Sequence, residues 1–339
     1  MAGKSMKYFQ KINDKSKWKE FLGKTLFQTF FHNLQWEEFL EEEFKWLKFE
    51  HYLYKSEAVL SLARVNIFGQ EKLISHPFCE YGGLLPLSSR IDGEEVKKAL
   101  FSEFKIPFII SFHPYLLNFF SFSEDGAKKE FSSNTYFIEN IHQRKISDIW
   151  SSLRKTLRHS IKKGQEQGIE IVQCREEKEL KSFYKIYLKT EKRHKGLPYP
   201  LSFFRFFLNS PDAEIILAKF NGKIIAGSVF LLYDKFIHYS KNASDERFRH
   251  LNANNLILWE EIKKYAGKDY HFFDLGGTGQ NNSLKVFKEA WHGKKYHISD
   301  ISNIQQKPRG KKTKIRNILG ILPGFLMERI GPYILRFKV

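Results

Sequence analysis

The sequence has few cysteines and acidic residues and no long uninterrupted apolar run. Its two cysteines, Cys79 and Cys174, form no CxxC spacing, which excludes a disulfide framework and argues against a zinc site. The N-terminus has no apolar core of signal-peptide length, and prolines break the most apolar run, residues 106–122. We therefore expect a cytoplasmic protein without a metal or redox cofactor.

Aromatic and basic residues are abundant instead. The 33 Phe and 15 Tyr among 339 residues predict buried cores large enough for two domains. Lys and Arg number 56 against 38 Asp and Glu, a formal net charge of +18. Such a charge attracts polyanions or an acidic membrane surface, and so narrows the class of partner.

The first part of the chain reads as a helix followed by strands. Residues 36–44 carry the apolar stripe of an amphipathic helix. Residues 52–65 read as strands separated by a polar turn, and residues 76–86 as a strand that ends in a Gly-Gly turn. Residues 106–122 are predicted to form buried strand and turn.

Near residue 147 the pattern becomes that of one amphipathic helix. Apolar residues recur every four positions, and basic residues recur at the same interval on another face. The apolar set is Ile149, Leu153, Leu157 and Ile161, and the basic set is Arg154, Arg158 and Lys162. Gly168 is expected to end the helix in the left-handed conformation. We place a domain boundary before this helix, between residues 1–146 and 147–302.

The second domain is predicted to run from helices to strands. Residues 183–207 read as helical around a loop, and Asn221-Gly222 between two apolar runs signals a β-hairpin. A strand at 236–239, a helix at 255–265 and a strand at 270–275 follow. This order is typical of the core of a GNAT-like acyltransferase domain.

Residues 303–339 form a basic, partly amphipathic tail with nine Lys or Arg against one Glu. Such a segment is typical of contact with a membrane surface or with phosphates. Prolines and glycines break any long helix in it, and packing against the N-terminal domain is the alternative.

Six stretches, in this order along the chain, resemble the FemAB family of the GNAT superfamily. They are HNLQWEEFLEEEF, LARVNIFGQEKLISHPFCEYGGLL, LRKTLRHSIKKGQEQGIEI, RHKGLPYPLSFF, HYSKNASDERFRHLNANNLILWEEI, and FDLGGT with FKEAWHG. The resemblance implies an α+β fold of two tandem GNAT-like domains with mixed central sheets. It also implies transfer of an acyl group to an amine; in the peptidoglycan-bridge members the donor is aminoacyl-tRNA and the acceptor a muropeptide precursor.

The resemblance places the donor at Arg249, Asn252 and Asn254. Ordinary GNAT enzymes hold the CoA pyrophosphate on backbone N–H groups here, with glycines where this sequence has the two asparagines. The added side chains favour a donor other than CoA, and helix capping by the asparagines is the alternative. Arg154 and Arg158 are further donor candidates, because tRNA is a polyanion; a solvated helix face is the alternative.

Amide formation needs a deprotonated amine and a positive group for the developing oxyanion. Lys288, in FKEAWHG, matches the family's lysine and is predicted to supply that charge; His292 is an insertion relative to the family pattern. Asp274, at the end of a strand, is predicted to accept the amine proton or to orient Lys288, with a turn ligand as the alternative. Phe287 is assigned to the substrate side of the same segment.

Four residues are assigned to the acceptor. Arg193 and His194 match a family position at which Arg contacts an acceptor phosphate, and a surface ion pair is the alternative. Tyr239 and Ser244 match the acceptor-side strand and loop, where they are predicted to bond a sugar or peptide; a core position for Tyr239 is the alternative.

Three functions remain open. The first is a FemAB-like N-acyltransferase acting on an amine of a peptidoglycan or polysaccharide precursor, at the inner face of the membrane. The second is an acyl-CoA-dependent N-acyltransferase acting on an amino sugar. The third is a non-catalytic GNAT scaffold that binds anionic glycan, lipid or RNA. The sequence does not decide the donor, the acceptor or the oligomeric state.

Overall fold

The computed structural model describes residues 8–122, 130–279, 282–304, 333 and 335–337. Its contacts divide the chain into two compact units. Unit 1 comprises residues 1–134 and 296–307 with residue 339, and unit 2 comprises residues 135–295 and 308–338. Along the chain, the division between the units falls between residues 134 and 135, whereas the sequence analysis placed the domain boundary between residues 146 and 147. The predicted tail falls mostly at 305–332, outside the described residues.

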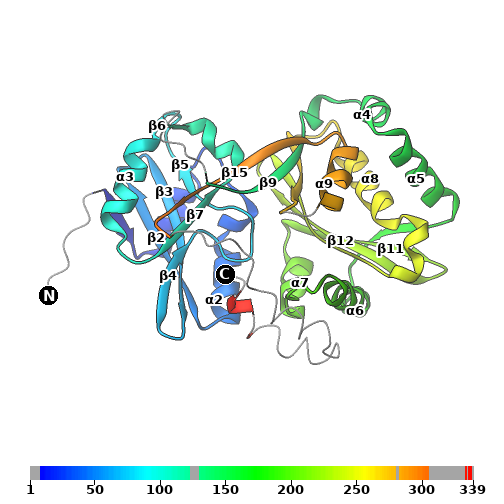
Figure 1. Cartoon of the computed structure of the whole chain (residues 1–339), viewed down its shortest axis with the longest axis horizontal. Coiled ribbons are helices and arrows are strands. Elements are labelled where there is room, and N and C mark those ends of the chain that lie inside the picture. The colour runs from blue at the N-terminus through cyan, green and yellow to red at the C-terminus, as the bar shows by residue number, and fades with distance from the viewer. Residues whose placement is uncertain (1–7, 123–129, 280–281, 305–332, 334, 338–339) are drawn as a thin grey trace. The chain divides into compact units, whose positions relative to one another are not determined.

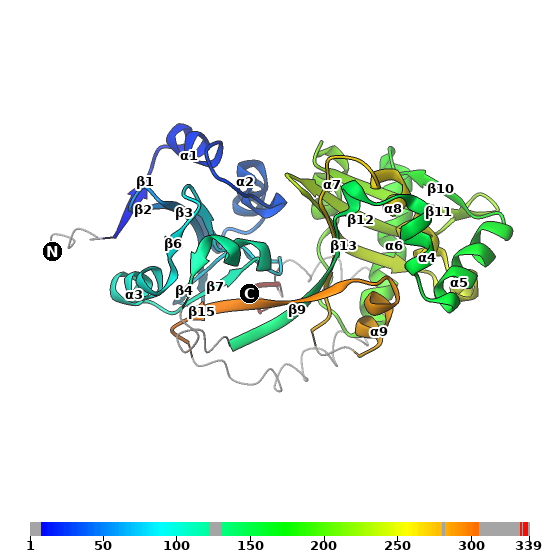
Figure 2. The same cartoon turned by 90° about the horizontal axis from the view of Figure 1, so that it is seen from above.

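Unit 1 is built on a mixed sheet in the order β1-β2-β3-β4-β7-β15. Its elements are β1 (Phe9–Ile12), α1 (Lys15–Leu22), η1 (Phe30–His32), α2 (Leu34–Glu43), β2 (Leu47–Tyr54), β3 (Ala58–Ile67), β4 (Gln70–Ile74), β5 (Leu84–Pro86), β6 (Ile91–Asp92), α3 (Gly93–Glu103), β7 (Phe108–Phe112), η2 (Pro114–Phe119), β8 (Phe120–Ser121) and β15 (Lys294–Ser302). Along this order, neighbouring strands are antiparallel except for β4 and β7, which are parallel, and β6 and β8 form a separate parallel pair. In Figure 2, α1 lies by β1, and α2 packs against β2.

Unit 2 repeats this scheme in the order β9-β14-β13-β12-β11-β10. Its elements are β9 (Glu130–Glu139), η3 (Ile141–Gln143), α4 (Ile146–Ser152), α5 (Lys155–Glu166), β10 (Glu170–Gln173), α6 (Glu177–His194), α7 (Leu201–Asn209), β11 (Ala213–Phe220), β12 (Lys223–Tyr233), β13 (Phe236–Ser244), η4 (Glu246–Leu251), α8 (Ala253–Tyr265), β14 (Phe272–Gly277), α9 (Asn282–Ala290) and η5 (Leu335–Phe337). Again a single neighbouring pair, β13 and β14, is parallel. The α+β prediction with mixed sheets is confirmed.

Helices cover both faces of the unit 2 sheet. In Figure 1, α5 and α8 lie on one face, and α6 and α7 lie on the other. Helix α6 packs closely on strand β12 because residue 227 is a glycine. A Cβ atom at Gly227 would lie 2.6 Å from the ring of Phe183. On the opposite face, the predicted stripe Ile149, Leu153, Leu157 and Ile161 is buried in one core with α8.

The single helix predicted from residue 147 is wrong, because the chain forms two helices, α4 and α5. Leu153 and Arg154 between them have extended backbones. The hydroxyls of Ser151 and Ser152 donate to the carbonyls of Asp148 and Ile149 and so satisfy the end of α4. The apolar spacing continues across this break, which is why periodicity does not reveal it.

Two other turns test the sequence patterns. Asn221 and Gly222 both have positive φ, as a two-residue hairpin between β11 and β12 requires, and Gly168 has φ +74° after α5. The strand predicted over 76–86 is wrong before Leu84, because His76 and Phe78 take left-handed backbones that interrupt an extended chain.

Within the described residues, no helix combines the length and apolar character needed to cross a bilayer.

Candidate active site

Two parallel strands separate at the centre of the candidate site. β13 and β14 are paired only from Phe236↔Phe272 to His238↔Asp274. Beyond this point β13 continues along β12, and β14 continues along β9 after a register shift between Asp274 and Gly277. Gly276 has φ +76° within the shift, a conformation that favours glycine. Polar side chains therefore gather where the strands part.

Asp274 is fully buried, and hydrogen bonds hold both of its carboxylate oxygens. Oδ1 accepts from the Thr135 hydroxyl at 2.6 Å and from the Gly276 N–H at 2.7 Å, and Oδ2 lies 2.7 Å from His238 Nδ1. A buried carboxylate is stable only with such partners. Asp274 is thus both a turn ligand, as the alternative stated, and the partner of a histidine.

His238 is the residue that the sequence patterns missed. Its side chain is buried, and in the tautomer in which Nδ1 donates to Asp274 the Nε2 atom is the ring nitrogen that carries no hydrogen. One signal for His238 was present in the sequence. It precedes Tyr239 in an apolar strand, and because successive residues of a strand point to opposite faces, a core position for Tyr239 puts His238 on the other face of the sheet. Its partner on β14 comes from a strand pairing that the sequence does not specify.

Lys288 lies on α9 and is only 5% exposed. Its Nζ donates to the carbonyl oxygen of Gly277 at 2.5 Å. The Asp274 carboxylate and the Lys288 ammonium therefore bond backbone groups of two successive residues, Gly276 and Gly277. Lys288 is not a solvated surface lysine, and its buried charge lies next to Gly277, the last residue of β14.

The remaining acceptor candidates on β13 and α9 lie in or beside the core. The ring of Tyr239 packs on Phe230 with 5.3 Å between centroids, and burial raises the pKa of its hydroxyl. The carbonyl oxygen of Ser244 accepts from the Thr190 hydroxyl at 3.3 Å. Phe287 is half-buried against the core of unit 2. Tyr239 thus occupies the core position that was its alternative.

Arg193 and His194 end α6 on the surface, and the structure brings them to Arg249 of η4. Arg193 forms an exposed ion pair with Glu246 at 3.3 Å. Partial burial and then the charges of Arg193 and Arg249 lower the pKa of His194. The predicted acceptor and donor arginines therefore share one surface of unit 2.

The two asparagines at the start of α8 differ from each other. Asn252 has the left-handed backbone (φ 56°) that the glycine of a phosphate loop would supply, and its side chain does not cap the helix. Its Nδ2 instead lies 3.4 Å from the His250 carbonyl. Oδ1 of Asn254 is buried and has no hydrogen-bond partner within the described part of the chain. Side-chain capping by Asn252 is therefore wrong.

The basic face of α5 lies next to this loop. Gly164 of α5 approaches η4 closely, since a Cβ atom there would lie 3.2 Å from the Leu251 carbonyl oxygen. Arg158 donates to the Ser151 carbonyl at 3.2 Å, so it supports the link between α4 and α5. The Arg154 side chain is exposed. Of these two donor candidates, Arg154 is exposed and Arg158 is partly buried.

Comparisons with known proteins agree with this geometry. Residues 151–289 match the family described as acetyltransferase (GNAT) domain. The fold is similar to that of FemX (TM-score 0.62, 13% identity, 86% of this chain and 97% of that one). It is also similar to L-PGS from Bacillus licheniformis (TM-score 0.55, 13% identity, 93% and 98%).

A tandem GNAT protein from the clavulanic acid biosynthesis pathway has a similar fold as well (TM-score 0.50, 8% identity, 88% and 99% of the two chains). No curated protein matches the sequence. The predicted tandem GNAT-like fold is confirmed, and that fold is shared with FemX.

Proposed function

We propose that the protein is an N-acyltransferase of FemAB type, which moves an aminoacyl or acyl group onto an amine of a cell-envelope precursor. The observation that carries the proposal is that the buried Lys288 ammonium bonds Gly277 while the Asp274 of the His238–Asp274 pair bonds the preceding Gly276, within the stretch that matches a GNAT domain. These residues supply the two functions that amide formation requires, a proton acceptor and a positive charge.

His238 is the proton acceptor in this proposal. An amine attacks an acyl carbon only after it loses its proton, and Nε2 of a neutral imidazole can take that proton directly or through one water. Asp274 acts as a positioning residue, because its bond to Nδ1 fixes the ring and stabilises the imidazolium that forms. The proton then passes from Nε2 to the oxygen or sulfur of the leaving group.

Lys288 stabilises the tetrahedral intermediate. As the C–N bond forms, the carbonyl oxygen gains negative charge, and it loses that charge when the C–O or C–S bond to the donor breaks. A cation held in a site of low dielectric constant stabilises this oxyanion more than it would in water. Burial of the Lys288 side chain and its bond to Gly277 support this role.

Aminoacyl-tRNA is the proposed donor. Arg154 and Arg249 are exposed on unit 2 and offer contacts for a phosphate backbone, and the net charge of +18 adds a long-range attraction. The same charge supports action at the inner, anionic surface of a membrane. Solved neighbours of the same fold, FemX and L-PGS, agree with an acceptor from the cell envelope.

One observation favours acyl-CoA as a second candidate donor. Asn252 adopts the left-handed backbone that glycine provides in phosphate loops, so the loop before α8 keeps the required conformation in spite of the asparagine. An acyl-CoA-dependent transfer would use the same His238 and Lys288.

The test offers the purified full chain aminoacyl-tRNA and acyl-CoA in parallel, with a panel of amine acceptors, and follows product mass with and without RNase. Product that disappears after RNase treatment identifies the tRNA donor, and RNase-resistant product from acyl-CoA identifies the second candidate. Binding of RNA, lipid or glycan without product from either donor would contradict transfer and favour a scaffold role.

A further inference from the structure

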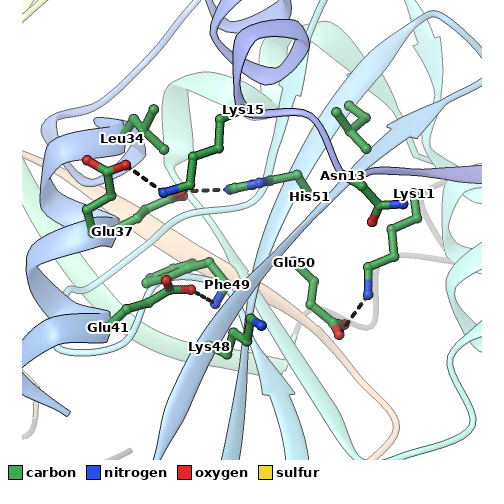
Figure 3. A pocket seen from close by; sticks show the side chains of 12 residues that line it. Lys11, Asn13, Lys15, Leu34, Glu37, Glu41, Lys48, Phe49, Glu50 and His51 are labelled. Atoms are coloured by element: carbon green, nitrogen blue, oxygen red, sulfur yellow. Dashed lines mark hydrogen bonds and ion pairs between the residues drawn. The ribbon is translucent and has the colours of Figure 1, made fainter. Parts of the chain in front are cut away.

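Unit 1 contains a pocket that no part of the proposed transfer uses. Its volume is about 300 Å³, and it lies between the end of β1, the start of α1, helix α2 and strand β2. In Figure 3, Glu37 and Glu41 reach the pocket from α2, whereas Lys11 and Glu50 lie on the opposite side. Pockets of this size hold small ligands, and a few placed polar groups decide which ones.

The floor of the pocket is a buried carboxylate. Glu37 is 1% exposed, and its two oxygens bond the Ser61 hydroxyl at 2.5 Å and His51 Nε2 at 2.7 Å. Burial raises the pKa of Glu37. His51 in turn stacks on the buried Trp18, with 4.1 Å between ring centroids. These contacts fix one wall in place before any ligand enters.

Most charges on the walls are paired within the protein. Lys15 bonds Glu38 at 2.7 Å, and Lys11 bonds Glu50 at 3.0 Å. Burial raises the pKa of Glu50, but hydrogen bonds from Arg64, and then from Tyr52 and Lys11, outweigh it and lower that pKa to about 2. These groups are therefore already neutralised.

One carboxylate and one ammonium remain unmatched. Glu41 accepts the Phe49 N–H at 2.6 Å, and its charge contributes to raising the pKa of Lys15 and that of Glu37. Lys48 lines the pocket from β2. Across the described ranges, neither Glu41 nor Lys48 forms a salt bridge with any residue. Glu38 and Glu41 thus share one ammonium on the α2 side, and Lys48 is the cation that has no carboxylate.

We infer that this pocket binds a small zwitterion of amino-acid type, with its ammonium group toward Glu41 and its carboxylate toward Lys48. The ligand would supply the two countercharges that the protein lacks, and His51 and Glu37 would bound it on the inner side. Since the groups involved are partly open to solvent, the affinity is expected to be on the order of 1 mM. The proposed transfer by unit 2 does not use this site.

The test is a titration of the full chain with glycine and alanine, followed by NMR or calorimetry, with ethylamine and acetate as probes that carry one charge each. Saturable binding of an amino acid, at least about tenfold tighter than that of either single-charge probe, supports the inference. Ethylamine or acetate binding as tightly as alanine would overturn it, and so would the absence of saturable binding of either amino acid.

Variants locate the site. Glu41→Gln retains an acceptor for the Phe49 N–H, so it removes the charge without removing that bond, and Lys48→Met keeps the length of the side chain. Each is expected to weaken alanine binding at least about fivefold, whereas Glu42→Gln, an exposed neighbour on α2 that does not line the pocket, is expected to leave it unchanged. Equal binding by wild type and Glu41→Gln would contradict the assignment whether or not transfer is ever observed.

Discussion

His238 and Asp274 face each other at the last paired position of the parallel strands β13 and β14, with 2.7 Å between Nδ1 and Oδ2. The two residues lie 36 positions apart, so no local sequence pattern specifies their pairing. The Asp274 carboxylate is held from two further directions by Thr135 and the Gly276 N–H, so the direction of the histidine ring is set by a rigid partner.

Replacement of His238 by Gln is expected to lower kcat/KM about 10²- to 10⁴-fold, because a positioned base typically contributes that much. The acidic limb of the pH–rate profile, which reports protonation of the base, should disappear as well. The measurement is kcat/KM against pH for the full chain. His159→Gln, an exposed change on α5, serves as the control, and an unchanged acidic limb in His238→Gln would rule out this base.

Asp274→Asn should act through His238 rather than on the substrate. The amide offers Nδ1 a donor or an acceptor, so the ring is no longer fixed in one tautomer, and kcat falls with little change in KM. In a double-mutant cycle, Asp274→Asn should cost far less activity in the His238→Gln background than in the wild type. Additive losses would show that Asp274 acts independently of the histidine.

Lys288→Met is expected to lower kcat about 10²- to 10³-fold with KM nearly unchanged, since the charge it removes acts on the intermediate. Lys285→Met is the matched control, because Lys285 is an exposed residue of the same helix. Steady-state kinetics and a thermal melt of each variant separate loss of chemistry from loss of fold. A folded Lys288→Met variant with wild-type kcat would refute the assigned role.

Unit 1 should lose stability in mild acid because of two buried histidines. Burial lowers the pKa of His32 to about 3 and that of His76 well below its ordinary value, and their rings pack at 4.4 Å. The unfolded chain therefore binds more protons below about pH 6.5, so their contribution is complete above that pH and falls as the pH drops toward 3.

The expected slope is about 1.4 kcal/mol per pH unit for each histidine over that range. Urea unfolding of the full chain at a series of pH values measures it. His32→Gln should flatten the slope, whereas the exposed His159→Gln should not. A free energy of unfolding that is constant from about pH 6.5 to about pH 4 would contradict this account.

Local sequence patterns predicted those features that depend only on residues close together in the chain. The stripe from Ile149 to Ile161 identified a core face, and Asn221-Gly222 identified a hairpin, because spacing and backbone preference act within a few residues. The break after Ser152 was hidden because the same spacing continues into α5. Lys288 was singled out through the family resemblance, which carried information on position that its surroundings in the sequence do not.

Contacts between distant parts of the chain were not predictable. His238 became a candidate only when β14 was placed beside β13, and no single-sequence pattern specifies which strands pair in parallel. Likewise, Tyr239 and Phe287 fit a substrate site by resemblance, yet packing places Tyr239 against Phe230 in the core and Phe287 beside it. Which face of a strand a residue occupies depends on the sheet around it.

The three donors that hold Asp274 lie at residues 135, 238 and 276, so the bond from Thr135 spans 139 positions of the chain. During synthesis on the ribosome, the His238–Asp274 pair cannot be assembled until β14 has emerged and joined β9. A nascent or partly folded chain would therefore lack the proposed base until folding of this unit is complete.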